Sequence, residues 1–219
     1  LFQNSVSDEN INQEHGDFSL FADGNIAYIA RKDVDKTKGG NTQEIVIQKL
    51  SSDWQTIDYA SNKLALLQNN HEQPIIFKKE GWWYIITQEL CAYCTKDKKV
   101  IYRRTQNDPT TSPYTDPIIH AIKSMGQSCQ GQIQSVLKTN TGKYYLVYDR
   151  WDSISDDDNI GKQNQSQAKF KWQELSFNSE DGINAYTCTN RVTIETNEFV
   201  WHIFRASNAS TCPARLTTW

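Results

Sequence analysis

The sequence predicts an all-β protein with a propeller-like fold, and its 219 residues accommodate about four blades. Two observations indicate strands rather than helices. Apolar residues seldom recur at the i, i+3, i+4 spacing of a helix, and β-branched and aromatic residues dominate the apolar runs. A third observation is a hairpin that recurs roughly every 50 to 60 residues, as the blades of a propeller do.

The repeated unit is a strand, a polar turn with a glycine, and a second strand. It occurs three times, as FSLFADGNIAYIA (18–30), PIIFKKEGWWYIIT (74–87) and SVLKTNTGKYYLVYDRW (135–151). The turn glycines are 57 and 61 residues apart, at Gly24, Gly81 and Gly142. This regular spacing predicts that each hairpin forms the inner part of one blade.

Segments between the hairpins supply the outer strands of the blades. They are EIVIQKLSSDW (44–54), KVIYRRT (99–105) and AKFKWQELSF (168–177). A weaker aromatic segment, NEFVWHIF (197–204), follows about one period later and is expected in a fourth blade. We therefore expect a single partial propeller domain over residues 1–219, in which residues 1–14 form an N-terminal tail or strand.

Composition excludes two classes of partner. The chain has a formal net charge of −3 and a pI near 5.8, and its Lys and Arg residues are scattered, so no basic footprint for a nucleic acid is present. No run of 18 apolar residues occurs, so no membrane-spanning helix is predicted.

The cysteines and the glycosylation sequons favour an oxidising, secretory compartment. The chain has an odd number of cysteines, which leaves one thiol free or paired with another chain: Cys91, Cys94, Cys129, Cys188 and Cys212. Two Asn-x-Ser sequons begin at Asn164 and Asn208. Together these features predict a secreted or extracellular glycoprotein with disulfides.

Two features invite a metal site, but neither has the required spacing. The pair Cys91-Ala-Tyr-Cys94 has no second CxxC and no histidine at ligand spacing. The acidic segment DSISDDDN (152–159) lacks the glycine and the glutamate of a calcium-binding EF-hand loop, so a solvated acidic loop is the better interpretation. We predict no metal and no cofactor.

Three polar residues occupy equivalent positions in the three hairpins. Asp17, Glu72 and Gln134 stand seven, nine and eight residues before their turn glycines. Because the first strand of each blade lines the central axis of a propeller, the three side chains should converge at one end of the channel. The alternative is that each one is a solvated or turn-capping group, which is the usual role of an isolated acidic residue at the start of a strand.

Two carboxylates that face one site are the minimal equipment for glycoside hydrolysis. Glu72 is flanked by Pro74 and Ile75, and both desolvation and a neighbouring carboxylate raise the pKa of a carboxyl group, so Glu72 is the predicted proton donor. Asp17 would supply the neighbouring charge. Gln134 is an ordinary amide, which can orient a water or a sugar hydroxyl but is not a strong base.

At these residues the chain resembles glycoside hydrolase family 43, the five-bladed propeller glycosidases, and most closely its exo-β-1,3-galactanase-like branch. GDFSLFADGNIAYIA is similar to the family segment RDMTLFVDDDGKAY, and HEQPIIFKKEGWWYIIT is similar to REAPAMFKRNGKYYLIT. GQIQSVLKTNTGKYYLVYDRW is similar to FGSQSTFVLP followed by ADRW. The resemblance covers roughly residues 15–175, and the C-terminal segment 186–219 matches poorly.

The resemblance implies roles for the three converging residues. Asp17 would tune the pKa of the acid, Glu72 would be the general acid, and Gln134 would be an unusual base or water-positioning group. The resemblance also implies a disulfide from Cys91 or Cys94 to Cys129, which leaves Cys188 with Cys212 as the second pair.

Four residues are candidates for contact with a sugar substrate: Trp83, Tyr93, Arg150 and Trp151. The two aromatic residues Trp83 and Tyr93 could stack on a sugar ring, although strand aromatics lie more often in a core. Only one of the adjacent Trp82 and Trp83 can face inward, because strand side chains alternate. Arg150 and Trp151 belong to the segment that is similar to the family's DRW.

The chain departs from the family at two motif positions and at its beginning. Gly16 and His71 replace the arginines that precede the aspartate and the glutamate in the family motifs. The family's first blade has no counterpart in the 16 residues before Asp17. We therefore expect either a fragment or processing product, whose first blade is supplied by another polypeptide, or a smaller, inactive relative.

The expected function is hydrolysis of a β-linked galactan or a related extracellular polysaccharide by an inverting mechanism. The alternative is a catalytically inactive protein, either glycan-binding or a structural subunit of an extracellular glycoprotein assembly. A polysaccharide or glycan is the expected partner in the first case, and in the glycan-binding form of the second.

Overall fold

The computed structural model describes residues 13–35, 42–67, 70–91, 97–111, 123–150 and 169–188. All regular secondary structure in these ranges is β-strand, as the sequence predicts. The strands are β1 (Gln13–Asp23), β2 (Ile26–Asp35), β3 (Thr42–Lys49), β4 (Leu64–Leu67), β5 (His71–Lys79), β6 (Trp82–Glu89), β7 (Lys99–Thr105), β8 (Lys123–Gln127), β9 (Gln132–Lys138), β10 (Tyr144–Arg150) and β11 (Lys169–Leu175).

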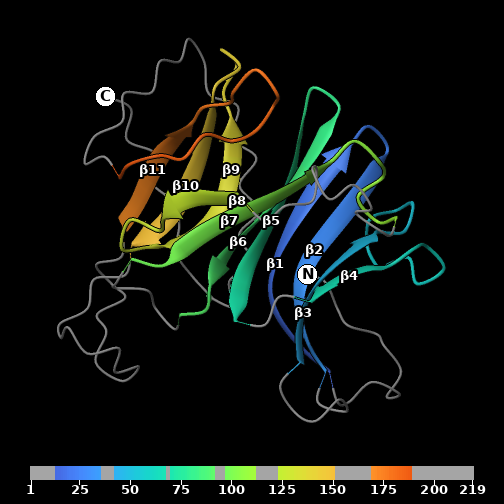
Figure 1. Ribbon diagram of the computed structural model, residues 1–219. Coiled ribbons are helices and arrows are strands. Elements are labelled where there is room, and N and C mark those ends of the chain that lie inside the picture. The colour runs from blue at the N-terminus through green and yellow to red at the C-terminus, as the bar shows by residue number, and fades with distance from the viewer. Residues whose placement is uncertain are drawn as a thin grey trace, which may run out of the picture.

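The strands form three antiparallel sheets, in the orders β1-β2-β3-β4, β5-β6-β7-β8 and β11-β10-β9. Each sheet contains one predicted hairpin, and the expected outer strands are present as β3, β7 and β11. The first strand of each hairpin, β1, β5 or β9, is an edge of its sheet, and β5 contacts both of the others (Figure 1). The prediction of propeller-like blades is therefore confirmed for three sheets. Residues 197–204, expected in a fourth blade, lie outside the described ranges.

The hairpin turns adopt the conformations that their glycines permit. Glu80 and Gly81, between β5 and β6, have φ of 50° and 85°, and positive φ at both residues is the requirement of a two-residue type I′ turn. Gly142, with φ of 82°, lies in the longer loop between β9 and β10, which is closed by a hydrogen bond from Thr139 N to Lys143 O (2.8 Å). These turns set the strand register that fixes which side chains face inward.

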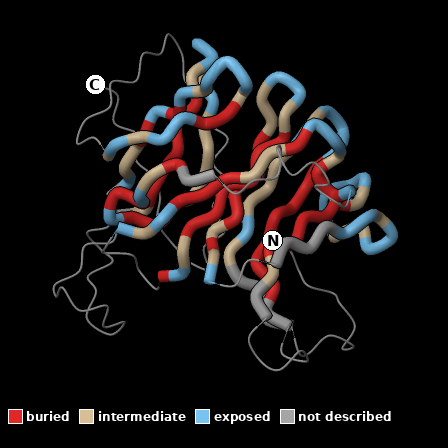
Figure 2. Tube along the Cα trace, in the orientation of Figure 1, coloured by how far each residue is buried: buried red, intermediate tan, exposed pale blue. Residues whose placement is uncertain are grey.

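The middle sheet is buried on both faces, because it lies between the other two sheets (Figure 2). Its residues that pack with the third sheet are Ile75, Phe77, Tyr84 and Ile86. Its residues that pack with the first sheet are Ile76, Trp83 and Ile85. Burial of both faces explains why the sequence of β5 and β6 is a continuous apolar run rather than an alternating pattern.

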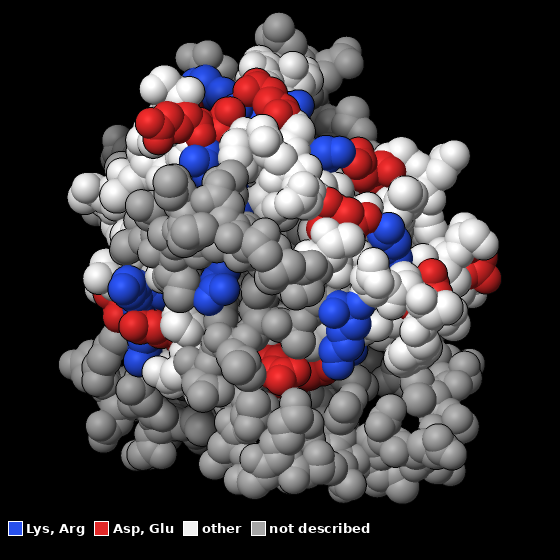
Figure 3. All heavy atoms as spheres, turned by 45° about the vertical axis from the view of Figure 1, so that its right-hand side comes forward, with Lys and Arg blue, Asp and Glu red and all other residues white. Residues whose placement is uncertain are grey.

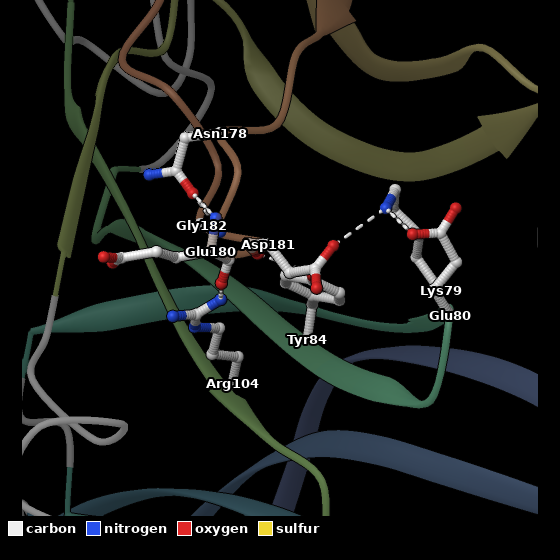
Figure 4. A network of polar contacts seen from close by, with 8 residues as sticks. All are labelled: Lys79, Glu80, Tyr84, Arg104, Asn178, Glu180, Asp181 and Gly182. Carbon is white, nitrogen blue, oxygen red and sulfur yellow. Dashed lines mark hydrogen bonds and ion pairs between the residues drawn. The ribbon is translucent and has the colours of Figure 1, made fainter.

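A turn that follows β11 fastens the third sheet to the second. The side chain of Asn178 closes this turn by accepting hydrogen bonds from Glu180 N (3.0 Å) and Gly182 N (2.8 Å). The Tyr84 hydroxyl donates to the backbone oxygen of Asp181 (2.6 Å). Figure 4 shows the network, in which three side chains of the second sheet reach the turn: Lys79, Tyr84 and Arg104.

A disulfide joins Cys129 to Cys188, with 5.4 Å between their Cα atoms. The expected pairings, of Cys129 with Cys91 or Cys94 and of Cys188 with Cys212, are therefore wrong. Cys91 is also in a disulfide, and its partner lies outside the described residues.

The path of the chain after β11 is the physical reason for the observed pairing. Tyr186 N donates to Met125 O (2.9 Å), and the Tyr186 hydroxyl donates to Gln127 O (3.0 Å). These contacts lay the segment before Cys188 along β8, which brings Cys188 to the turn that contains Cys129.

Charged side chains of both signs are interspersed on the face shown in Figure 3, without a large patch of one sign among the described residues. Within the described ranges, no helix has the length and apolar character needed to cross a membrane.

The disulfide yields a stability prediction. Replacing Cys188 by Ser should lower the free energy of unfolding by about 2–4 kcal/mol, because the bridge closes a loop between residues 59 apart in sequence. Urea denaturation of the wild type, Cys129→Ser, Cys188→Ser and the double variant measures this loss. The two single variants and the double variant should lose the same amount, and an additive loss in the double variant would contradict the pairing.

Candidate active site

A β-bulge interrupts each of the three inner strands at a predicted site residue. In β1 the pairing with β2 shifts between His15 and Phe18, which brackets Asp17. In β5 it shifts just after Glu72, and in β9 Gln134 is the extra residue opposite the Val147–Tyr148 step of β10. Bulges commonly re-aim a side chain next to an active site. The repeat recognised in the sequence therefore has a structural counterpart in all three blades.

The sequence around Glu72 favours the bulge. Gln73 adopts a left-handed conformation with φ of 52°, and Pro74 follows it. Proline has no N–H to donate to a ladder, so within a sheet it is suited to a bulge or an edge strand, and here both conditions hold. Glu72 is thus the last residue before the ladder is broken, and it still pairs with Gln88 of β6.

The carboxyl group of Glu72 is buried, with 5% of the residue exposed. Its Oε1 atom accepts hydrogen bonds from Cys91 N (2.8 Å) and from Gln132 Nε2 (3.4 Å). Burial raises the pKa of Glu72 to about 7, the Asp17 charge also raises it, and the hydrogen bonds and the Lys32 charge oppose this shift. A carboxyl group with this pKa carries a proton for about half of the time at neutral pH, as a general acid must.

Asp17 is half-buried on β1 and is tied directly to the segment that carries Glu72. Its Oδ2 atom accepts a hydrogen bond from Gln73 N (3.3 Å). Burial raises the pKa of Asp17, while this hydrogen bond and the Lys32 charge lower it. The structure therefore brings Asp17 and Glu72 together, as the repeat predicts, although the two residues are 55 positions apart.

Gln88, which the sequence did not single out, links the parts of the site behind Glu72. It is fully buried; its Nε2 atom donates to Cys91 Sγ (3.0 Å) and its Oε1 atom accepts from Ile133 N (3.0 Å). One side chain thus holds both the residue whose N–H reaches Glu72 and the strand that carries Gln132. The only signal in the sequence is an amide directly after the apolar run of β6.

The third inner strand supplies an amide to Glu72, and this amide comes from Gln132. Gln134, the predicted residue, is half-buried at the bulge two positions further along β9. Sequence spacing could not separate the two glutamines, because an extra residue in a strand changes which side chains face a given side. The role expected for Gln134 stays a prediction.

The other predicted site residues have different outcomes. Trp83 is 4% exposed and packs edge-on against Phe21 and Tyr28, with ring centroids 5.5 and 4.8 Å away. It is therefore a core residue rather than a sugar-stacking platform. Side chains predicted to contact sugar or carry glycans lie outside the described part of the chain: Tyr93, Arg150, Trp151, Asn164 and Asn208. Cys94, Cys212 and the acidic loop 152–159 lie outside it as well.

Among the described residues, no group of three or more His, Cys, Asp or Glu side chains could hold a metal ion. The described polar groups that act on Glu72 are the carboxyl group of Asp17, the Lys32 charge, the Cys91 N–H and the Gln132 amide.

No model of a known protein family matches the sequence. No curated protein matches it either. Solved structures do match by fold, and the first is an exo-β-1,3-galactanase from Clostridium thermocellum, with a TM-score of 0.55 and 20% identity. That match covers 78% of this chain and 34% of the galactanase.

Two further solved structures show the range of proteins with this fold. An exo-β-1,3-galactanase from Phanerochaete chrysosporium with galactose has a TM-score of 0.53 and 15% identity over 80% of this chain and 36% of that one. An endo-1,4-β-xylanase from Bacteroides thetaiotaomicron has a TM-score of 0.52 and 17% identity over 80% and 59%. The chain thus spans about a third of the length of these two galactanases.

The raised pKa of Glu72 yields a prediction that does not depend on activity. The unfolded carboxyl group ionises near its ordinary pKa of 4.5, whereas the folded group keeps its proton up to about pH 7, so stability falls as pH rises through this window. Glu72→Gln, which cannot ionise, should be more stable than the wild type at pH 8 by up to about 3 kcal/mol. The two proteins should unfold alike at pH 4.

Urea denaturation at both pH values measures this difference. If the difference in the free energy of unfolding between the variant and the wild type is the same at pH 4 and pH 8, Glu72 has an ordinary pKa and the prediction is wrong. The arrangement of the three sheets and their inner strands is the propeller-like fold of the glycoside hydrolase family 43 galactanases.

Proposed function

We propose that this protein is a glycoside hydrolase that cleaves a β-linked galactan or a related extracellular polysaccharide with inversion at the anomeric carbon. The observation that carries the proposal is Glu72, a buried carboxyl group with a pKa near 7 beside the second carboxyl group of Asp17. The galactan is suggested by the motif similarity and by the galactanases among the solved structures of the same fold. The fold by itself leaves the substrate open, since a xylanase shares it.

In the proposed mechanism, Glu72 donates its proton to the glycosidic oxygen as the bond from that oxygen to the anomeric carbon breaks. A water molecule attacks the opposite face of the sugar ring and then loses a proton to solvent. Gln134 would orient this water, because an amide can donate and accept hydrogen bonds but is a poor base. The ionised Asp17 raises the pKa of Glu72, which favours return of a proton to Glu72 after each turnover.

A second candidate is glycan binding without turnover. The observation that favours it is the third inner strand, where the described residues Gln132 and Gln134 provide amides in place of another carboxylate to act as base. A structural subunit that is completed by another polypeptide would belong to this class. We also propose that the protein is extracellular in either case, and the Cys129–Cys188 disulfide supports this location.

Removal of the proton donor tests the hydrolase directly. Glu72→Gln should lower the rate of galactose release from a β-1,3-galactan by about 10²- to 10⁴-fold, the usual contribution of a general acid. Glu80→Gln, at the exposed turn between β5 and β6, is the matched control and should keep the wild-type rate. Full turnover in Glu72→Gln would contradict the assignment, whereas wild-type protein that binds galactan without hydrolysing it would favour the second candidate.

Asp17 should set the pH dependence of the reaction. Activity of the wild type should decline above about pH 7, where Glu72 loses its proton. Because the Asp17 charge raises the pKa of Glu72, Asp17→Asn should move this alkaline limb of the kcat/KM profile to lower pH. Asp23→Asn, at the other end of β1 and paired with Lys78, should leave the limb in place. An unchanged limb in Asp17→Asn would show that the two carboxyl groups are not coupled.

A further inference from the structure

Lys32 is a charged residue on the face of β2 that points toward the site. Tyr28 and Ala30 of the same strand lie in the core between the first and second sheets, and side chains alternate along a strand, so Lys32 points to the same side. The β1–β2 register pairs His15 with Asp33 and Phe18 with Arg31, which leaves the bulge that contains Asp17 opposite Lys32.

The neighbours of Lys32 on β2 are charged as well, but they neutralise each other on the opposite face. Arg31 donates from Nε and Nη2 to the two carboxylate oxygens of Asp33, at 3.0 and 3.1 Å. Arg31 Nη1 also donates to Gln48 Oε1 (2.7 Å), and both Arg31 and Asp33 are buried. On this face of β2 the charges of Arg31 and Asp33 are therefore paired and hydrogen-bonded, and Lys32 takes no part in these contacts.

Lys32 is 9% exposed, and its ammonium makes no hydrogen bond or ion pair with a described residue. The carboxyl oxygens nearby accept from neutral donors, Asp17 from Gln73 N and Glu72 from Cys91 N and the Gln132 amide.

A largely buried ammonium without a hydrogen-bonded partner lowers the stability of the fold, because only more distant charges offset the loss of its hydration. Here the charge of Lys32 acts on both Asp17 and Glu72. Within the described part of the chain the donors of this ammonium have no hydrogen-bond acceptor, and Lys32 lies opposite the bulge that carries Asp17. An oxygen-rich ligand placed between Lys32 and the two carboxyl groups would meet these donors directly.

We infer that Lys32 is a substrate-binding residue, whose ammonium donates a hydrogen bond to an oxygen of the saccharide bound beside Asp17 and Glu72. The inference rests on the proposed function and extends it to the class of sugar. With Asp17 as a carboxylate, Lys32 as an ammonium and Glu72 as the acid that the proposed mechanism requires, these three groups together carry no net charge. The site therefore favours a neutral sugar over a uronate, which would add an uncompensated negative charge.

The test compares sugar binding by full-length proteins in a Glu72→Gln background, where the ligand is not consumed. Isothermal titration calorimetry with galactose and β-1,3-galactobiose should show that adding Lys32→Met weakens binding by about ten- to a hundredfold, the cost of losing a hydrogen bond from a charged donor. Lys79→Met is the matched control, because Lys79 is also mostly buried but is paired with Glu80 and Asp181. Galacturonate should bind more weakly than galactose to the Glu72→Gln parent.

Methionine keeps the length of the lysine stem, and thermal unfolding of each variant verifies that it is folded. Equal affinity in the parent and in Lys32→Met would overturn the inference while leaving the proposed function intact. Tighter binding of galacturonate that depends on Lys32 would overturn the assignment of a neutral sugar. Absence of sugar binding by both the wild type and the parent would remove the proposed function, and the inference with it.

Discussion

The three edge strands that meet inside this protein impose the constraint on which the rest of the structure depends. Among the described strands, β1, β5 and β9 each pair with a neighbour on one side only, so N–H groups on the other side need other partners. Side chains of adjacent sheets supply them: Ser19 accepts from Ile76 N, Asp17 from Gln73 N and Gln88 from Ile133 N. At these positions the sheets are thus joined by hydrogen bonds from backbone N–H groups to side-chain oxygens.

The same constraint produces the chemistry of the site. A polar side chain that accepts a hydrogen bond from an N–H group of an inner strand lies at the seam between two sheets, where it is shielded from water. Asp17 illustrates this directly, since it caps the N–H of Gln73 while facing the neighbourhood of Glu72. The bulge after Glu72 turns its carboxyl group toward Cys91 N and the β9 amide, and burial then raises its pKa. The carboxyl groups that accept hydrogen bonds from backbone N–H groups here are therefore the same groups whose pKa values are raised by burial.

The fold and the specificity of the site are separable. Galactanases and a xylanase share this arrangement of sheets at 20% identity or less, so the β-hairpins provide a frame and the side chains at the seam decide what is bound. In this chain the seam combines two carboxyl groups with the Lys32 ammonium and the amides of β9. The disulfide from Cys129 holds the turn that leads into these amides, which ties the site to a distant part of the chain.

Local rules in the sequence determined the hairpins, the outer strands and the approximate position of the site. Turn glycines, apolar runs and their period identified the repeat, and equivalent positions in a repeat identified Asp17 and Glu72 as neighbours. Only the tertiary structure decided which glutamine reaches Glu72, which cysteine pairs with Cys129, that Trp83 is a core residue, and that Gln88 and Lys32 belong to the site.

The physical reason is that short-range patterns report the period and the turns of a strand, whereas these outcomes depend on contacts between strands. One extra residue in β9 changes which glutamine faces β5, and the return of residues 183–188 across β8 places Cys188 beside Cys129. The groups that shift the pKa of Glu72 besides its burial, such as Asp17, Lys32 and Gln132, likewise lie far away in the sequence. The sequence by itself therefore determined the repeated unit and its acidic positions, and the packing of the units decided the partners and the protonation of those positions.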